Sequence, residues 1–169
     1  FQGVEGAYSQ AAMKAYFGEE ISTFHVEQWR DAMEAIAEGS ADFAVLPIEN
    51  STAGSVNDMY DLLVEFENYI VGEQIIRCCH ELLGVPGASL ADIKTVYSHP
   101  QALSQCRPYL EDHREWKQVP VENTAVAAKK VAEEKDKTQD AIASGFAGEC
   151  FGLDVLAEKI YSNKANSTR

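Results

Sequence analysis

The sequence predicts an α/β fold, because short apolar runs alternate with amphipathic stretches along the chain. The chain has 169 residues, of which 46% are apolar, so it can bury a substantial core. The alternation stops at an extended middle stretch, residues 70–83, and then begins again. This restart predicts two lobes of similar size, with a small-ligand site in the cleft between them.

Apolar spacing and turn residues define the elements that we expect in the first half of the chain. Pro47 has no backbone N–H to donate to a sheet, so residues 48–51 are expected to form a strand end and a loop. The expected elements are a helix over Tyr8–Phe17, a strand over 22–26, a helix over Trp29–Ala37 that ends at Gly39, a buried strand over 43–46, and a helix over 56–66.

The second half follows the same logic. Pro100 is favoured in the first turn of a helix, and it therefore marks a helix start. The expected elements are a strand over 95–97, a helix from Pro100, a strand over 117–121, a helix over 123–134, a polar turn over 135–137, a strand over 141–143 and a short helix over 147–151. The type of the apolar stretch 153–160 stays open.

Charge and residue spacing exclude several classes of function. A formal net charge of −13 repels nucleic acid and anionic lipid, so we expect neither nucleic acid nor a membrane as a partner. The four cysteines contain no Cys-x-x-Cys spacing, and we expect them to be buried, reduced thiols of a cytoplasmic protein. The four histidines are scattered, without a His-Glu-x-x-His motif, so we expect no metal and no cofactor.

Polar clusters lie where an expected strand passes into an expected helix. The clusters are residues 6–9, 49–51 with 54–55, 98–101, and 123–124. Ligands collect at the carboxyl ends of strands in open α/β sheets, and unpaired N–H groups at helix starts bind anions. Such clusters could hold a dicarboxylate even in an acidic protein. Each cluster taken alone is more typical of ordinary helix capping.

Read together, a set of segments resembles the catalytic domain of prephenate dehydratases. The segments are 3–9 (Gly-Val-Glu-Gly-Ala-Tyr-Ser), 46–51 (Leu-Pro-Ile-Glu-Asn-Ser), 54–56 (Gly-Ser-Val), 69–73 (Tyr-Ile-Val-Gly-Glu), 98–103 (Ser-His-Pro-Gln-Ala-Leu), 105–106 (Gln-Cys), 123–125 (Asn-Thr-Ala), 152–156 (Gly-Leu-Asp-Val-Leu) and 166–169 (Asn-Ser-Thr-Arg). They occur in the family's order and cover nearly the whole chain, so the ordered set is far more specific than any one of them.

The resemblance implies a single catalytic domain over residues 1–169 with a periplasmic-binding-protein-like fold of two α/β lobes and an active-site cleft between the lobes. It implies lobe 1 over about 1–72 and about 157–169, and lobe 2 over about 73–156, with the terminal Thr-Arg segment crossing back to lobe 1. It also implies a homodimer or higher homo-oligomer. Family members commonly carry a C-terminal phenylalanine-binding regulatory domain and some carry chorismate mutase. Neither domain lies within these residues, and both are expected only in a longer parent chain.

The activity that the resemblance implies is the decarboxylating dehydration of prephenate to phenylpyruvate, on the way to L-phenylalanine. The resemblance places Thr168 at the leaving hydroxyl group, where it would act as a positioned hydrogen-bond donor. Glu49 is the second catalytic candidate, either as a proton donor or as a structural acceptor that orients Asn50 or Thr168, and both roles stay open. The expected substrate-binding residues are Asn50, Ser51, Ser55, Ser98, His99, Gln101, Asn166 and Arg169.

Two alternatives stay open at this point. Arogenate dehydratases resemble the same segments and give L-phenylalanine directly, and the sequence does not distinguish the two substrates. The two-lobed fold also serves solute receptors, so a non-catalytic module that binds a small anion is the rival from another class. His99 is equally expected to be a helix cap, and Arg169 is expected to pair with the carboxylate that the product retains.

Overall fold

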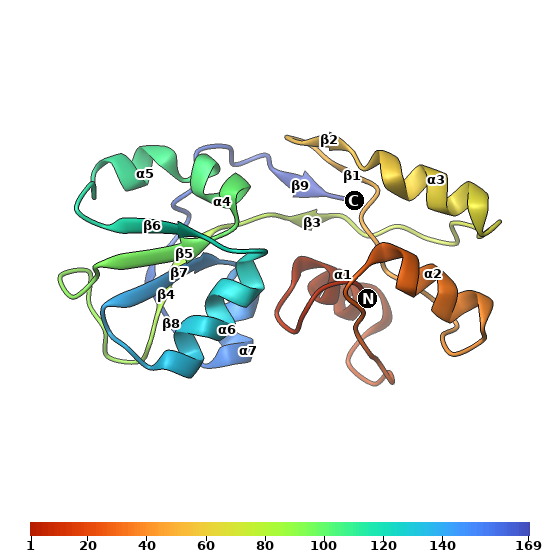
Figure 1. Cartoon of the computed structure of the whole chain (residues 1–169), viewed down its shortest axis with the longest axis horizontal. Helices are drawn as coiled ribbons and strands as arrows, with labels where there is room; N and C mark the ends of the chain where they lie inside the picture. The colour runs from red at the N-terminus through yellow and green to blue at the C-terminus, as the bar shows by residue number, and fades with distance from the viewer. The chain divides into compact units, whose positions relative to one another are not determined.

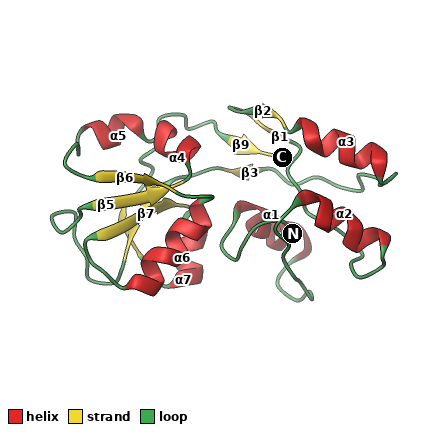
Figure 2. Ribbon diagram, in the orientation of Figure 1, coloured by secondary structure: helices red, strands yellow, loops and turns green.

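The computed structural model describes residues 1–169 and divides them into two compact units. Unit 1 contains Phe1–Cys78 and Ala165–Arg169, and unit 2 contains Cys79–Lys164. Both units contain helices and strands, and each unit has its own sheet (Figures 1 and 2). The predicted α/β class is therefore confirmed.

Unit 1 joins a small sheet to three helices. Its elements are α1 (Tyr8–Phe17), α2 (Trp29–Ala37), β1 (Glu49–Asn50), β2 (Gly54–Ser55), α3 (Asn57–Glu65), β3 (Ile76–Arg77) and β9 (Ser167–Thr168). The strand order is β2-β1-β9-β3, and every pair is antiparallel. The last strand of the chain therefore lies between two strands that come from the first half of the sequence.

The core of unit 1 lies between α2 and α3. Met33 of α2 packs with Met59 and Leu62 of α3, and all three side chains are at least 92% buried. Both helices carry their apolar residues at helical spacing, which turns one face of each toward the other. Side chains from the chain before and after β1 pack against this cluster, which anchors β1.

Two predicted strands of unit 1 are not formed. Residues 22–26 contribute only an isolated parallel bridge from Val26 to Gln2, and residues 43–46 have no strand partner. The prediction that 43–46 is a buried strand is wrong, because Phe43 is 57% exposed. Both segments instead line a cavity of about 500 Å³. An apolar run becomes a strand only where a neighbouring backbone accepts and donates its hydrogen bonds.

Unit 2 is built around a five-stranded sheet. Its elements are β4 (Glu81–Gly84), β5 (Thr95–Ser98), α4 (Pro100–Gln105), α5 (Arg107–Glu111), β6 (Lys117–Pro120), α6 (Thr124–Glu134), β7 (Gln139–Ala143), α7 (Gly145–Phe151) and β8 (Asp154–Ala157). The strand order is β6-β5-β7-β4-β8. Strand β5 is parallel to both of its neighbours, whereas β4 is antiparallel to both of its own.

Helices cover both faces of this sheet (Figure 1). Leu82 and Ile142 pack on one side with residues of α4 and α5, while Leu83 and Ala141 pack on the other side with residues of α6 and α7. Neighbouring residues of a strand point to opposite faces, so two successive apolar residues supply both cores. The helix predicted from Pro100 and the strands near 95, 117 and 141 are confirmed.

Helix caps in unit 2 follow the signals in the sequence. Asn123 Oδ1 accepts a hydrogen bond from the N–H of Val126 at 2.8 Å, and Ser144 Oγ accepts one from Ala147 at 3.1 Å. Each side chain satisfies one of the N–H groups that a helix start leaves unpaired. The open stretch 153–160 forms β8 at its start.

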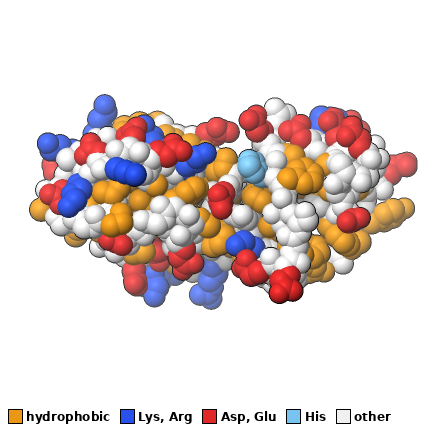
Figure 3. All heavy atoms as spheres, turned by 90° about the horizontal axis from the view of Figure 1, so that it is seen from below, with side chains coloured by type: hydrophobic (Ala, Val, Ile, Leu, Met, Phe, Trp, Pro, Cys, Tyr) orange, Lys and Arg blue, Asp and Glu red, His pale blue; other side chains and the backbone are white.

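The surface and the thiols match the composition in part. On the face drawn in Figure 3, acidic and basic side chains are interspersed and apolar side chains are exposed between them. Cys78 and Cys106 are buried as expected, but Cys79 and Cys150 are only partly buried, and no disulfide bond is formed.

No helix combines the length and the apolar character that a membrane span requires.

Candidate functional site

Thr168 occupies the centre of the small sheet of unit 1. It lies on β9, opposite Asn50 of β1 on one side and opposite Ile76 of β3 on the other. Asn50 and Thr168 are 118 positions apart in the sequence, yet Asn50 Nδ2 donates a hydrogen bond to Thr168 Oγ1 at 2.9 Å. The tail of the chain is therefore held beside the Glu-Asn-Ser turn of the first half.

The Asn50 amide is fully used inside unit 1. Its Nδ2 also donates to Asn166 Oδ1 at 2.9 Å, and its Oδ1 accepts from the backbone N–H groups of Thr52 and Ala53, both at 2.9 Å. Those two backbone donors fix which end of the amide carries the oxygen. Asn50 therefore orients Thr168, and it could donate to a substrate only by giving up one of these acceptors.

A thiol approaches Thr168 from the opposite edge. Cys78 follows β3, and its backbone N–H donates to Asn166 O at 3.0 Å, which extends the pairing of β3 with β9. Its side chain is 94% buried, and Sγ lies 3.2 Å from Thr168 Oγ1. The Thr168 hydroxyl group thus has polar neighbours from both flanking segments.

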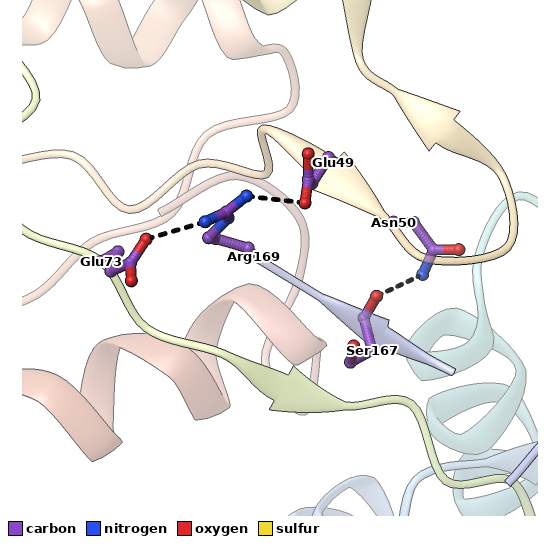
Figure 4. A network of polar contacts seen from close by, with 5 residues as sticks. All are labelled: Glu49, Asn50, Glu73, Ser167 and Arg169. Carbon is purple, nitrogen blue, oxygen red and sulfur yellow. Dashed lines mark hydrogen bonds and ion pairs between the residues drawn. The ribbon is translucent and has the colours of Figure 1, made fainter. Parts of the chain in front are cut away.

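Arg169 is held by two carboxylates. Its guanidinium donates to Glu49 at 2.7 Å and to Glu73 at 3.2 Å, as Figure 4 shows. The hydrogen bond that Arg169 donates to Glu49 is the main cause that raises the pKa of Arg169, and Glu73 adds to it. The three side chains together carry a charge of −1, so Arg169 does not present an unpaired positive charge. The predicted pairing of Arg169 with a substrate carboxylate requires it to exchange partners.

Ser51 and Asn166 fasten the tail through hydrogen bonds. Ser51 N donates to Ser167 O at 2.9 Å, Ser51 Oγ donates to Ala165 O at 3.2 Å, and Ser167 N donates back to Ser51 Oγ at 2.9 Å. Asn166 is 96% buried, and its Oδ1 accepts from Asn50. Ser55 is exposed on β2 opposite Glu49. Unit 1 thus brings together Glu49, Asn50, Ser51, Asn166, Thr168 and Arg169.

The other three predicted residues belong to unit 2, around the junction of β5 and α4. Ser98 is completely buried, and its hydroxyl group donates to Ile142 O at 2.6 Å. His99 is the N-cap of α4, and its Nδ1 accepts from the N–H of Gln101 at 3.2 Å. The Gln101 side chain is exposed. Ser98 and His99 therefore have structural partners within unit 2, and their roles as substrate ligands stay predictions.

Burial perturbs two further groups near this junction. His80 is 96% buried, and its Nε2 lies 2.7 Å from Gln105 Oε1. Desolvation lowers the pKa of His80, against a smaller opposite effect of Gln105, so the imidazole is neutral at pH 7. Burial raises the pKa of the Cys106 thiol to about 12, which keeps it protonated. Neither group forms part of a cluster that could hold a metal ion.

Two residues of the site in unit 1 were missed by the sequence analysis. Glu73 was noted only as part of a similar segment, and Cys78 only as a buried thiol. No local pattern identifies either one, because their partners lie 96 and 90 positions away. The signal that could have found them is their place on the extended stretch 70–83, which runs beside the returning tail.

The geometry around Thr168 can be compared with known proteins. Residues 1–169 match the family model described as prephenate dehydratase. The chain belongs to the prephenate dehydratase family. Mixed α/β structures of this family have the same fold, and a prephenate dehydratase from Arthrobacter aurescens, solved in complex with L-Phe, is similar with a TM-score of 0.85 and 31% identity. That similarity covers 99% of this chain and 57% of the other.

Relatives within the prephenate dehydratase family carry more than one activity in their names. The chain is 44% identical to arogenate dehydratase/prephenate dehydratase 1, chloroplastic, from Arabidopsis thaliana, over 100% of this chain and 43% of that protein. It is 38% identical to the bifunctional chorismate mutase/prephenate dehydratase of Escherichia coli K12, over 100% of this chain and 45% of that protein. A solved structure described as GqqA, a novel type of quorum quenching acylases, is also similar, with a TM-score of 0.88, 37% identity, and coverage of 99% of this chain and 60% of that one. The chain thus spans less than half the length of these two curated relatives.

Proposed function

We propose that this chain is a prephenate dehydratase catalytic domain, which removes carbon dioxide and water from prephenate to give phenylpyruvate. The observation that carries the proposal is the hydrogen bond between Asn50 and Thr168, which links the tail to the Glu-Asn-Ser turn in a member of this family. Formation of an aromatic ring drives the reaction. Catalysis then needs a group that stabilises the departing hydroxide, and surroundings that do not hold back the carboxylate that leaves as carbon dioxide.

Thr168 is the proposed donor to the leaving hydroxyl group. A threonine hydroxyl barely ionises, so it stabilises the departing oxygen by a hydrogen bond instead of acting as a strong acid. The hydrogen bond that Thr168 accepts from Asn50 polarises its O–H and makes it a better donor. Such a donor helps most in the transition state, where negative charge develops on the departing oxygen.

The neutral character of this region suits the carboxylate that leaves. A cation beside it would stabilise the ground state and raise the barrier to decarboxylation. The groups that contact Thr168 Oγ1 are an amide and a thiol, whereas Arg169, the next residue in the chain, is paired with Glu49 and Glu73. We assign Glu49 the structural role of holding Arg169, because its carboxylate is engaged in that ion pair.

The finer arrangement of the site is also part of this proposal. Ser98, His99 and Gln101 of unit 2 would complete a cleft between two lobes of a periplasmic-binding-protein-like fold, and Arg169 would hold the carboxylate that phenylpyruvate retains. This part rests on the family resemblance. The homo-oligomeric state is a prediction that also rests on the resemblance. The cytoplasmic location is a prediction too, and the Arabidopsis relative differs from it in being named chloroplastic.

The test of the proposed function is the turnover of prephenate by this chain, followed through phenylpyruvate absorbance. We expect Thr168→Ala to lower kcat about tenfold or more, which is about 1.4 kcal/mol of lost transition-state stabilisation. Thr23→Ala, a matched change at an exposed position of the same unit, should leave turnover unchanged. A folded Thr168→Ala variant with normal turnover would remove Thr168 from the mechanism. Tight binding of prephenate without product would favour the non-catalytic receptor.

Arogenate is the second candidate substrate, and the similarity to an Arabidopsis arogenate dehydratase/prephenate dehydratase supports it. Arogenate carries an amino group where prephenate carries a keto oxygen, so the two substrates differ at the end that is not eliminated. Steady-state kinetics on both substrates decide between them. A kcat/KM that is more than about tenfold higher for arogenate would assign the chain to the arogenate pathway instead.

A further inference from the structure

We propose that Cys78 is a positioning residue for Thr168. Its thiol donates a hydrogen bond to Thr168 Oγ1 and thereby directs the hydroxyl proton of Thr168 toward the group that leaves. The inference rests on the proposed function, because it concerns the direction of the Thr168 hydroxyl group during dehydration.

The sheet places Cys78 at the right position. Ile76 lies directly opposite Thr168, and Cys78 is two residues further along the same segment, so its side chain points to the same face as that of Ile76. A residue two positions along from a directly paired one is a diagonal neighbour, which is still within contact range. The short distance of 3.2 Å between Cys78 Sγ and Thr168 Oγ1 is the result. Asn50 reaches the same oxygen from the strand on the other side of β9.

Counting hydrogen-bond positions then fixes the direction of the Thr168 proton. A hydroxyl oxygen can accept two hydrogen bonds and donate one. Asn50 Nδ2 can only donate, so it occupies one of the two acceptor positions. If Cys78 S–H occupies the other, the single O–H bond of Thr168 must point away from both neighbours. That is the arrangement in which the proton faces a substrate.

The opposite arrangement would be unproductive. The geometry allows either the thiol or the hydroxyl group to be the donor. If Thr168 donated to the sulfur, its only proton would be committed to a weak acceptor and the leaving hydroxide would receive none. The Cys78 thiol is buried against Thr168 Oγ1, and an S–H group is a weak donor as well as a weak acceptor, so it can donate here. Two donors on one oxygen also increase the acidity of the remaining O–H, because hydrogen bonds in a chain polarise one another.

Three substitutions at Cys78 separate this role from simple packing. Cys78→Ser keeps a donor of similar size, Cys78→Ala removes the donor and volume, and Cys78→Val fills the volume without a donor. We expect kcat for prephenate to fall about fivefold in the Ala and Val variants, with KM within about twofold of wild type, since one hydrogen bond is lost. The Ser variant should retain kcat within about threefold of wild type. Cys150→Ala on α7 is the control and should change neither parameter.

The order of the kcat values of the three Cys78 variants distinguishes a hydrogen-bonding role from a packing role. A packing role predicts that Val restores activity and that Ser, which buries a more polar group, is the worst of the three. Either Val at wild-type kcat or Ser no better than Ala would therefore overturn the proposal. Should the Ala variant fail to fold, as seen by circular dichroism, the comparison of Ser with Val still decides between the two roles.

Failure of the proposed function would look different. If the wild-type chain turned over neither prephenate nor arogenate, the proposed function and this inference would fall together. If the wild-type chain is active and the three variants follow the packing order, the inference alone fails. A further readout is the double variant of Cys78→Ala with Thr168→Ala. Its kcat should equal that of Thr168→Ala alone, since Cys78 acts only through the Thr168 hydroxyl group.

Discussion

Asp140 on β7 offers a quantitative test of the structure, because it is a completely buried carboxyl group without a hydrogen-bond partner on either oxygen. It lies beside Gly84 of β4, where an added Cβ would come within 3.2 Å of both carboxylate oxygens. Desolvation, with a smaller effect of Asp92, raises the pKa of Asp140 from 3.8 to about 7. The group is therefore neutral in the folded state under acidic conditions.

The sign and size of its effect on stability follow from linkage. Below pH 3.8 the carboxyl group is protonated in both states and adds no pH dependence to the stability. Between 3.8 and about 7 the unfolded chain loses this proton while the folded chain keeps it, so stability falls as the pH rises. The full loss above pH 7 is about 4 kcal/mol, at about 1.4 kcal/mol per pH unit.

The perturbation that removes this titration is Asp140→Asn. We expect the stability of the variant relative to wild type to rise by about 4 kcal/mol between pH 4 and pH 8. Urea unfolding followed by fluorescence measures it, and a Trp29→Phe background leaves Trp116 of unit 2 as the single tryptophan of the chain. The ring of His113 stacks on Trp116 with the ring centroids 3.9 Å apart, so the fluorescence of Trp116 depends on this contact. The fluorescence of the folded and of the unfolded chain is therefore recorded separately at each pH.

The control and the refuting result are equally specific. Asp112→Asn makes the same change at an exposed position of unit 2 and is measured alongside as the matched control. A difference between Asp140→Asn and wild type that stays within about 1 kcal/mol from pH 4 to pH 8 would refute the argument. Asp140 would then ionise without penalty, and the close packing against Gly84 would be wrong.

Three further predictions follow from the contacts described above. Asn123→Ala should destabilise unit 2 by about 1 kcal/mol through loss of the α6 cap, whereas Glu122→Ala at the preceding residue should not. Urea unfolding measures both variants, and an Asn123→Ala variant as stable as wild type would contradict the prediction. A metal chelator should leave prephenate turnover unchanged, since no group of three or more His, Cys, Asp and Glu side chains could hold a metal; activity that is lost and then restored by added zinc would contradict this. Glu73→Gln should lower KM for prephenate about threefold by loosening Arg169, whereas Glu20→Gln, an exposed control, should not.

Features with local signals were predictable from the sequence. The helix from Pro100 and the cap at Asn123 depend on residues within one turn of the helix start, so their signals lie next to each other in the chain. The failed strand at 43–46 shows the limit of this approach. A compact apolar run signals burial, but strand formation requires a partner backbone, and here the segment borders a cavity instead.

The contents of the candidate site were less predictable, because contact there depends on long-range pairing. Periodicity carries no information on whether Thr168 meets Asn50, and only the family resemblance indicated that the tail returns to the first half. Ser98 shows a contact that the local pattern does not reveal. A hydroxyl group at the end of a strand is typical of a ligand-binding position. Here the Ser98 hydroxyl group donates a hydrogen bond to the carbonyl group of Ile142 inside the sheet of unit 2. The carbonyl groups of a neighbouring strand are invisible to any local pattern.

The charge distribution in unit 1 explains why Glu73 is the informative position for substrate affinity. The proposed substrate is an anion although the protein has a net charge of −13, and Arg169 follows Thr168 directly in the chain. The guanidinium of Arg169 is shared between Glu49, at 2.7 Å, and Glu73, at 3.2 Å. A substrate carboxylate that displaces Glu73 exchanges one ion pair for another, so the gain is small. Glu73→Gln removes the competing charge without removing Glu49, and the freed attraction should appear in KM while kcat stays constant. A fall in kcat with unchanged KM would instead place Glu73 among the groups that act on the transition state.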